Sequence, residues 1–118
     1  MHLGELEQLL MFAVLRLGDA AYGNAIREEV ETRTSRVLSP GAVYTVLDRL
    51  EAKGLVGSEV TAATPARGGR RMRRYWVEPA GARALREVYA GLRRMAQGVG
   101  PKLDDLAAEG GAVGPVRR

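Results

Sequence analysis

Arginine dominates the stretch of this sequence whose residue types and spacing point most clearly to a chemistry. Five arginines fall within eight consecutive positions: Arg67, Arg70, Arg71, Arg73 and Arg74. Without them, thirteen basic residues face fourteen acidic ones, so the net charge of +4 arises in this one place. Like charges this close repel one another unless an anion neutralises them. Such a cluster is suited to binding phosphates; the alternative is a solvated loop that keeps the protein soluble.

Residue sets for catalysis or metal binding are missing from the sequence. It contains no cysteine, and its one histidine, His2, is next to the N-terminus. We find no pairing of serine with histidine, no catalytic pair of carboxylates and no glycine-rich phosphate loop. Asp104 and Asp105 lie in a weakly patterned C-terminal region. We therefore expect a protein that is not an enzyme and that uses no metal and no cofactor.

Length and composition predict one small globular domain. The chain has 118 residues, of which 46% are hydrophobic and 27% charged. It has no apolar run long enough to cross a bilayer and no N-terminal export signal. With the absence of cysteine, these features favour a cytoplasmic protein.

Two helices are predicted before residue 35. Apolar residues between positions 3 and 17 recur at helical spacing, while Leu3, Phe12 and Leu15 add apolar surface beyond one buried stripe. This excess suggests that the first helix also contacts a partner. A second amphipathic helix is predicted at residues 22–34. Tyr22, at its start, either contacts the backbone of a nucleic acid, whose phosphates the arginine cluster would suit, or packs in the core.

A third helix is predicted after Ser39, because a serine cap followed by Pro40 is typical of a helix start. Gly54 is the expected stop, in the left-handed conformation. The predicted buried face consists of residues at helical spacing: Val43, Val46, Leu47 and Leu50. The start of the helix and its other faces carry residues that we interpret as DNA contacts: Ser39, Gly41, Tyr44, Thr45 and Arg49. For Arg49, an ion pair within the protein is an equal alternative.

The arginine cluster is predicted to lie on a β-hairpin. Residues 55–62 and 72–78 are rich in β-branched or aromatic residues and are separated by proline and glycine. Alternation along the second strand places Arg73 on the side of Tyr75, so not every arginine can reach DNA at once. The best candidates for phosphate contacts, together with Gly69 at the tip, are Arg70 and Arg71. Trp76 is expected in the core, or alternatively against a ligand.

The last helix is predicted to begin at residues 78–80. Gly81, Leu85, Val88, Leu92, Met95 and Val99 repeat at alternating spacings of four and three, as in a seam between two helices. This seam packs either on its own domain or, as we expect, on a second subunit. The interface residues expected are Leu3, Phe12, Leu85, Val88, Leu92 and Met95. The predicted organisation is a DNA-binding domain at residues 1–78, a dimerisation helix at 79–107 and a disordered tail at 108–118.

The order of these elements is that of a winged helix-turn-helix, mainly α with a small β-hairpin. Three motifs resemble the PadR family of bacterial transcriptional regulators: YGNAIREEVE (22–31), LSPGAVYTVLDRLEAKGLV (38–56) and GGRRMRRYWVEPAG (68–81). The resemblance covers about four-fifths of the chain. It departs from the family at residues 77–81, where the family has Leu-Thr. The short C-terminal region resembles the subgroup with a single dimerising helix.

This resemblance implies a homodimeric repressor that binds an operator in double-stranded DNA and is often relieved by a small-molecule effector. The alternative function is a winged-helix module that binds another protein through its apolar first and last helices. In that case the arginines would act only through their charge.

Overall fold

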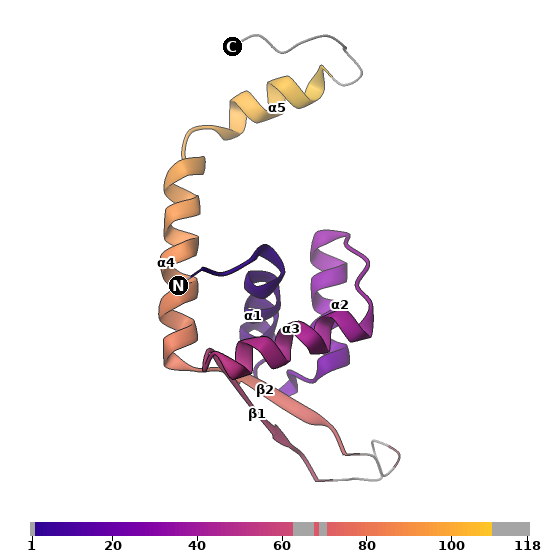
Figure 1. The fold of residues 1–118 in the computed structure, drawn as a ribbon. Coiled ribbons are helices and arrows are strands. Elements are labelled where there is room, and N and C mark those ends of the chain that lie inside the picture. Colours follow the sequence, from indigo (N-terminus) through magenta and orange to yellow (C-terminus); the bar gives the residue numbers. More distant parts are fainter. Residues whose placement is uncertain (1, 63–67, 69–70, 110–118) are drawn as a thin grey trace. The chain divides into compact units, whose positions relative to one another are not determined.

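Eight short elements follow one another in the computed structural model, which describes residues 2–62, 68 and 71–109 (Figure 1). They are α1 (Glu5–Leu17), η1 (Gly18–Ala20), α2 (Gly23–Thr34), α3 (Pro40–Ala52), β1 (Val56–Val60), β2 (Arg73–Val77), α4 (Pro79–Ala96) and α5 (Gly100–Ala108). This order confirms the predicted helical fold with a β-hairpin. Contacts between residues divide the chain into two units, 1–86 and 87–118. No helix in the described part combines the length and apolar character needed to cross a membrane.

The core of the first unit lies between α1, α2 and α3. All four residues predicted for the buried face of α3 are buried: Val43, Val46, Leu47 and Leu50. Leu10 and Met11 of α1 and Ile26 of α2 are also fully buried. The helical spacing of the apolar residues therefore places one face of each helix against the other two.

The ends of α3 follow the predicted capping chemistry. The Ser39 hydroxyl accepts a hydrogen bond of 3.1 Å from the Ala42 N–H, and Pro40 occupies the first turn. Gly54, after the helix, has a φ of +76°, the left-handed conformation expected of a glycine stop. These two caps fix which turn of α3 is first and which is last.

One ion pair joins α1 to the end of α3. The Glu7 carboxylate lies 2.8 Å from Lys53 Nζ and also accepts a hydrogen bond from the Gly4 N–H. Burial of Glu7 acts to raise its pKa, but the hydrogen bonds from Lys53 and Gly4 and the positive charges of Lys53 and Arg49 outweigh burial and lower it. Glu7 is thus held as a carboxylate inside the fold.

The hairpin pairs β1 and β2 in antiparallel register from Val56–Val77 to Val60–Arg73, and it projects from the three helices (Figure 1). The segment before α2 adds to it, because Tyr22 forms a β-bridge with Arg74 and the Tyr75 N–H donates to the Ala21 carbonyl at 2.9 Å. The Tyr75 side chain is buried, and this burial is the main cause that raises its pKa to about 12. The base of the hairpin is therefore part of the core.

Two residues assigned to a dimer interface lie instead in the chain's own core. Leu3 and Leu85 are each 3% exposed. Gly81 is also buried, and a Cβ atom there would lie 2.1 Å from the Leu55 carbonyl oxygen. The first part of the predicted seam thus packs the start of α4 onto its own domain, because a heptad pattern does not distinguish an internal partner from an external one.

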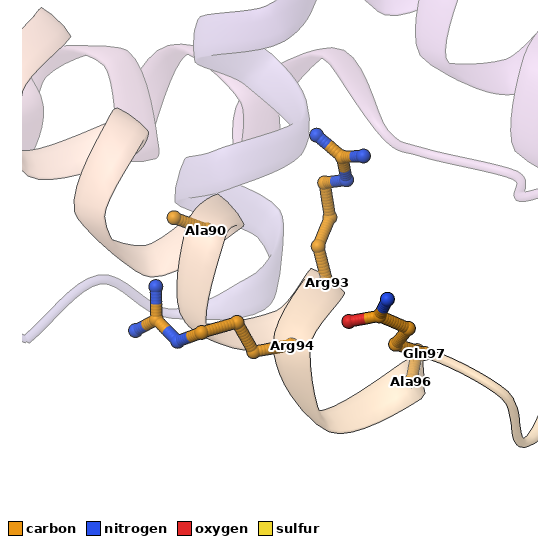
Figure 2. Close-up of a pocket in the computed structure, with 5 residues that line it drawn as sticks. All are labelled: Ala90, Arg93, Arg94, Ala96 and Gln97. Atoms are coloured by element: carbon orange, nitrogen blue, oxygen red, sulfur yellow. The ribbon is translucent and has the colours of Figure 1, made fainter.

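The predicted last helix, which begins within residues 1–86 and continues into the second unit, is divided into two. The chain turns after α4 at Gly98, whose φ is +78°, and α5 begins at Gly100. Arg93 and Arg94 project from the last turns of α4 (Figure 2), and the Arg93 guanidinium lies 5.6 Å from the centre of the Tyr89 ring. Among the described residues of this unit, the exposed large apolar side chains are Tyr89, Leu92, Met95, Leu103 and Leu106. Most of the predicted tail, residues 110–118, lies outside the described residues.

Candidate nucleic-acid interface

The face of α3 opposite the core carries an uninterrupted row of exposed residues: Gly41, Thr45, Asp48 and Ala52. Their spacing of four, three and four residues keeps them on one line along the helix. We call them the outer row. The exposed residues Ser39 and Arg49 flank this row. An α-helix with such a face has the dimensions and the polar groups required to contact base edges in a major groove.

Tyr44 lies beside the outer row and is packed against the start of α2. It is 44% exposed, and a Cβ atom at Gly23 would lie 2.3 Å from its hydroxyl oxygen. The ring occupies the space that a side chain at residue 23 would take, so a larger residue there would displace the ring. The sequence gives Tyr22-Gly23 as a motif, but the reason for the glycine depends on a contact with a residue twenty-one positions away.

Tyr44 forms one wall of a polar hollow of about 330 Å³. The other residues that line the hollow come from the start of α2 and from the chain leading into β2: Gly23, Asn24, Arg71, Met72 and Arg73. The hollow combines a tyrosine hydroxyl, two arginines and the N-terminus of a helix, all of which favour an anion. Two predicted contacts, Tyr44 and Arg71, therefore meet in one site, and Asn24 and Arg73 are added to it.

The sequence left two roles open for both Tyr22 and Arg49, a contact with DNA or a contact within the protein. Tyr22 is half-buried, precedes the first turn of α2 and bridges to β2. Arg49 is exposed, and among the described residues its side chain makes no ion pair. An internal salt bridge of Arg49 with Asp48 or Glu51 is therefore not formed, and the guanidinium remains available at the edge of the outer row.

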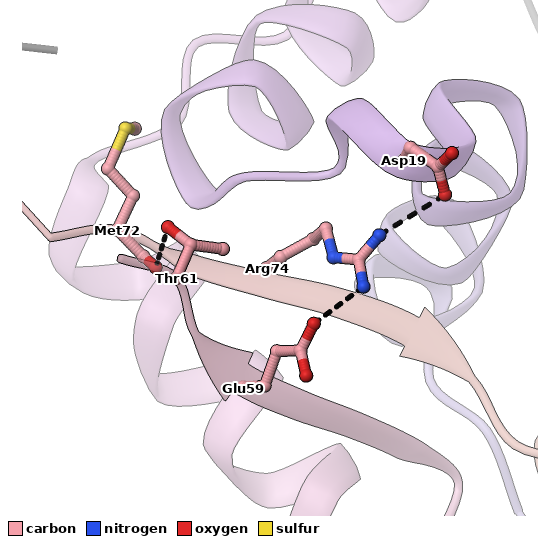
Figure 3. Close-up of polar contacts among 5 residues, drawn as sticks. All are labelled: Asp19, Glu59, Thr61, Met72 and Arg74. Atoms are coloured by element: carbon pink, nitrogen blue, oxygen red, sulfur yellow. Dashed lines mark hydrogen bonds and ion pairs between the residues drawn. The ribbon is translucent and has the colours of Figure 1, made fainter. Parts of the chain in front are cut away.

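The arginines of the cluster that the structure describes are not equivalent. Arg74 lies between two carboxylates, 3.2 Å from Asp19 and 2.6 Å from Glu59 (Figure 3). The hydrogen bond that Arg74 donates to the Glu59 carboxylate is the main cause that raises the pKa of Arg74. Arg73 donates to the Ser58 hydroxyl at 2.8 Å. Arg71 is exposed and makes no ion pair with another described residue.

The predicted contacts Gly69 and Arg70, and Arg67 of the same cluster, lie outside the described residues. In the part that is described, the distribution of partners indicates that Arg71 offers a net positive charge to an anion. Arg74 does not, because its charge is already matched by Asp19 and Glu59.

Trp76 is not in the core, where it was first expected. It is 37% exposed, its ring lies over Gly57, and its indole N–H donates to Glu78 at 3.0 Å. With residues of α1 and η1 it borders a second hollow of about 360 Å³, which also includes Leu15 and Val77. Side chains alternate along β2, so Tyr75 points inward and Trp76 outward. The expectation of a core position came only from the fact that Trp76 is aromatic.

Comparison with known proteins supports the same fold. The family described as "Transcriptional regulator PadR-like family" matches residues 11–87. The crystal structure of a PadR family transcriptional regulator from Eggerthella lenta is 30% identical, covers 84% of this chain and 86% of its own, and superposes with a TM-score of 0.62. A PadR family transcription regulator from Clostridium difficile is 26% identical over 82% of this chain and 97% of its own, with a TM-score of 0.67.

A more distant likeness shows the fold alone. The Aeropyrum pernix ORC1 protein, solved in complex with DNA, is 23% identical over 72% of this chain and 24% of its own, with a TM-score of 0.57. No curated protein matches the chain. The family match covers more than half of the sequence and includes α2, α3 and the hairpin. The chain therefore belongs to the PadR-like family of transcriptional regulators.

Proposed function

We propose that the chain is a homodimeric repressor that binds an operator through α3 and the hairpin. The observation that carries this proposal is the position of the outer row of α3 next to a hollow lined by two arginines. A helix face suited to base edges and a site suited to a phosphate lie side by side on the first unit. DNA offers both kinds of group, base edges in the major groove and phosphates along its borders.

The chemistry of the two parts differs. Thr45 of the outer row is placed to contact base edges, whereas the N–H groups at the start of α3, near Ser39 and Gly41, suit a phosphate. In the hollow, the Tyr44 hydroxyl donates a hydrogen bond to a second phosphate while Arg71 and Arg73 supply positive charge. Base contacts give sequence preference, and phosphate contacts give affinity and position.

Dimerisation is proposed through the exposed face of α4 around Leu92 and Met95, which are 61% and 79% exposed in the single chain. Two subunits related by a two-fold axis present two α3 helices to two half-sites of a palindromic operator. An effector bound between the subunits would favour one spacing of these helices and thereby change operator affinity. Tight binding at a promoter blocks transcription, which makes the protein a repressor.

Titration of random duplex DNA at several salt concentrations tests DNA binding. We expect affinity at low salt, and a logarithm of the binding constant that falls linearly with the logarithm of salt concentration because counterions are released. A protein-binding module would show no binding at low salt or a slope near zero, and either result would reject the proposal.

Repression is tested with the DNA fragments that the protein retains from its own genome. A reporter driven by such a fragment should lose expression when the protein is present, and deletion of the protein's gene should restore it. An increase in expression would show an activator instead.

A further inference from the structure

Asp48 is an acidic residue in the middle of the outer row of α3. It follows Gly41 by seven positions and Thr45 by three, and it is exposed. Within the part of the chain that the structure describes, its carboxylate takes part in no hydrogen bond or ion pair. No cationic side chain of the described residues therefore neutralises the Asp48 carboxylate.

Other carboxylates near this surface have partners. Glu51, on the next turn of α3, accepts a hydrogen bond of 2.9 Å from the Ser58 hydroxyl. Glu59 pairs with Arg74, and Glu7 pairs with Lys53. These contacts neutralise or occupy the acidic groups around the hairpin and leave the Asp48 carboxylate open to a ligand.

A free carboxylate is unfavourable at a DNA-binding surface unless the DNA supplies a hydrogen-bond donor. Phosphates repel it, and contact with DNA removes part of its water shell without replacing the lost hydrogen bonds. Because Asp48 lies on the line of α3 farthest from the core, it cannot turn away from a groove that the outer row enters. The groove itself must offer the donor.

The major groove presents donors at two base positions, the N4 amino group of cytosine and the N6 amino group of adenine. In adenine the amino group lies beside N7, which is an acceptor and repels a carboxylate. In cytosine no acceptor of the same base lies beside N4 on the groove edge. A carboxylate therefore discriminates in favour of cytosine.

We infer that Asp48 determines sequence specificity by accepting a hydrogen bond from N4 of a cytosine in each half-site. This inference rests on the proposed insertion of α3 into the major groove and adds the base that one of its side chains selects. Thr45, one turn earlier on the same row, would contact a neighbouring base pair.

Selection of binding sites from random duplex DNA by the full chain tests the inference. The wild-type protein should select sequences with a cytosine at one fixed position of each half-site. In the Asp48→Asn variant, adenine should replace it, because an amide can both donate to N7 and accept from N6. In the Asp48→Ala variant, the preference at that position should disappear while the preferences elsewhere remain.

Binding to the selected duplex gives the magnitude. Replacing the cytosine pair should weaken wild-type binding roughly 5- to 150-fold, the range for one mismatched base pair in a site. The same DNA change should have little effect on Asp48→Ala, because that variant has no carboxylate to lose its partner.

A matched charge control separates base contact from simple electrostatics. Glu28 is exposed on α2, and Glu28→Gln removes one negative charge as Asp48→Asn does. Glu28→Gln should retain the cytosine preference of the wild type. If both Asp48 variants also select the wild-type sequence at every position, the inference is overturned while DNA binding stands. If the wild-type protein binds no duplex at low salt, the proposed function fails and the inference fails with it.

Discussion

At the scale of single residues, the contact between Gly23 and Tyr44 links the start of α2 to α3. The tyrosine is 44% exposed, so the glycine is not needed to fill the core. It is needed because the ring lies where a Cβ atom would be, with its hydroxyl oxygen 2.3 Å from that position. The glycine thus sets the position of a hydroxyl that we propose as a phosphate donor.

Gly23→Ala should weaken DNA binding with little loss of stability. The new methyl group moves the exposed Tyr44 ring aside, whereas a helix tolerates alanine better than glycine. We expect a loss of binding free energy of about 1–2 kcal/mol, the value of one hydrogen bond to a charged group. Titration of duplex DNA and urea unfolding measure the two effects separately.

Tyr44→Phe is the comparison for this substitution, because it removes the same hydroxyl directly. The double variant should bind no more weakly than either single variant, since both changes remove one contact. Additive losses would show that Gly23 and Tyr44 act on DNA independently.

Glu7 gives a prediction about pH and stability. Its folded pKa lies below the ordinary value of 4.5, so its contribution is fully present above that pH and is lost as pH falls through the folded pKa. Glu7→Gln should therefore reduce the free energy of unfolding by about 1–2 kcal/mol at neutral pH, a moderate value because Lys53 is partly exposed. The difference from wild type should shrink below pH 4.5.

Urea unfolding at a series of pH values measures this difference. Glu28→Gln, which changes an exposed carboxylate of α2, should alter stability little at any pH. A Glu7→Gln deficit that persists undiminished in acid would mean that packing of the side chain, and not its charge, accounts for the effect.

At the scale of elements, the hairpin separates arginines that hold it in place from arginines that are open to a ligand. Arg74 joins β2 to β1 through Glu59 and to η1 through Asp19. Such exposed ion pairs add little to the free energy of unfolding, but they cancel the charge of the arginine. Arg71 has no such partner among the described residues and lines the hollow beside Tyr44.

Arg71→Gln and Arg74→Gln remove the same charge and should affect DNA binding differently. Arg71→Gln should weaken binding to all duplex sequences and reduce the salt slope by about 1, the value for one lost phosphate contact. Arg74→Gln should leave the slope close to that of the wild type, because Asp19 and Glu59 already neutralise it. Equal reductions in both variants would contradict this division of the arginines.

The buried face and both caps of α3 could be predicted from the sequence, because helical spacing and capping are local. The neutralisation of Arg74 could not, since its partners lie fifteen and fifty-five positions away. The role of Gly23 likewise depends on a contact between two helices. For the candidate site, residue types and their order predicted Tyr44 and Arg71 as contacts. The hollow that both residues line could be recognised only in the folded structure.

At the scale of the whole molecule, the predicted seam of the last helix has two uses. Leu85 packs within its own domain, whereas Leu92 and Met95, about two and three turns later on the same pattern, are exposed in the single chain. Large exposed apolar side chains at seam spacing favour a partner helix. The proposed interface is therefore shorter than the full pattern and is centred on the second half of α4.

Leu92→Asp should convert the protein to monomers. A symmetric interface contains the residue twice, and loss of two buried leucines should weaken association by about 4 kcal/mol even before the cost of placing carboxylates there. Because Leu92 is exposed in the single chain, the fold itself should change little. Sedimentation velocity measures the assembly state, and circular dichroism checks the fold.

Gln97→Asp is the control for this substitution. It places a charge just after α4 and away from the seam, so this variant should remain dimeric. A monomer formed by Leu92→Asp should also lose most affinity for a palindromic site while retaining weak binding to a half-site, because α3 and the hairpin are intact. Dimers that persist in Leu92→Asp would place the interface outside the exposed face of α4.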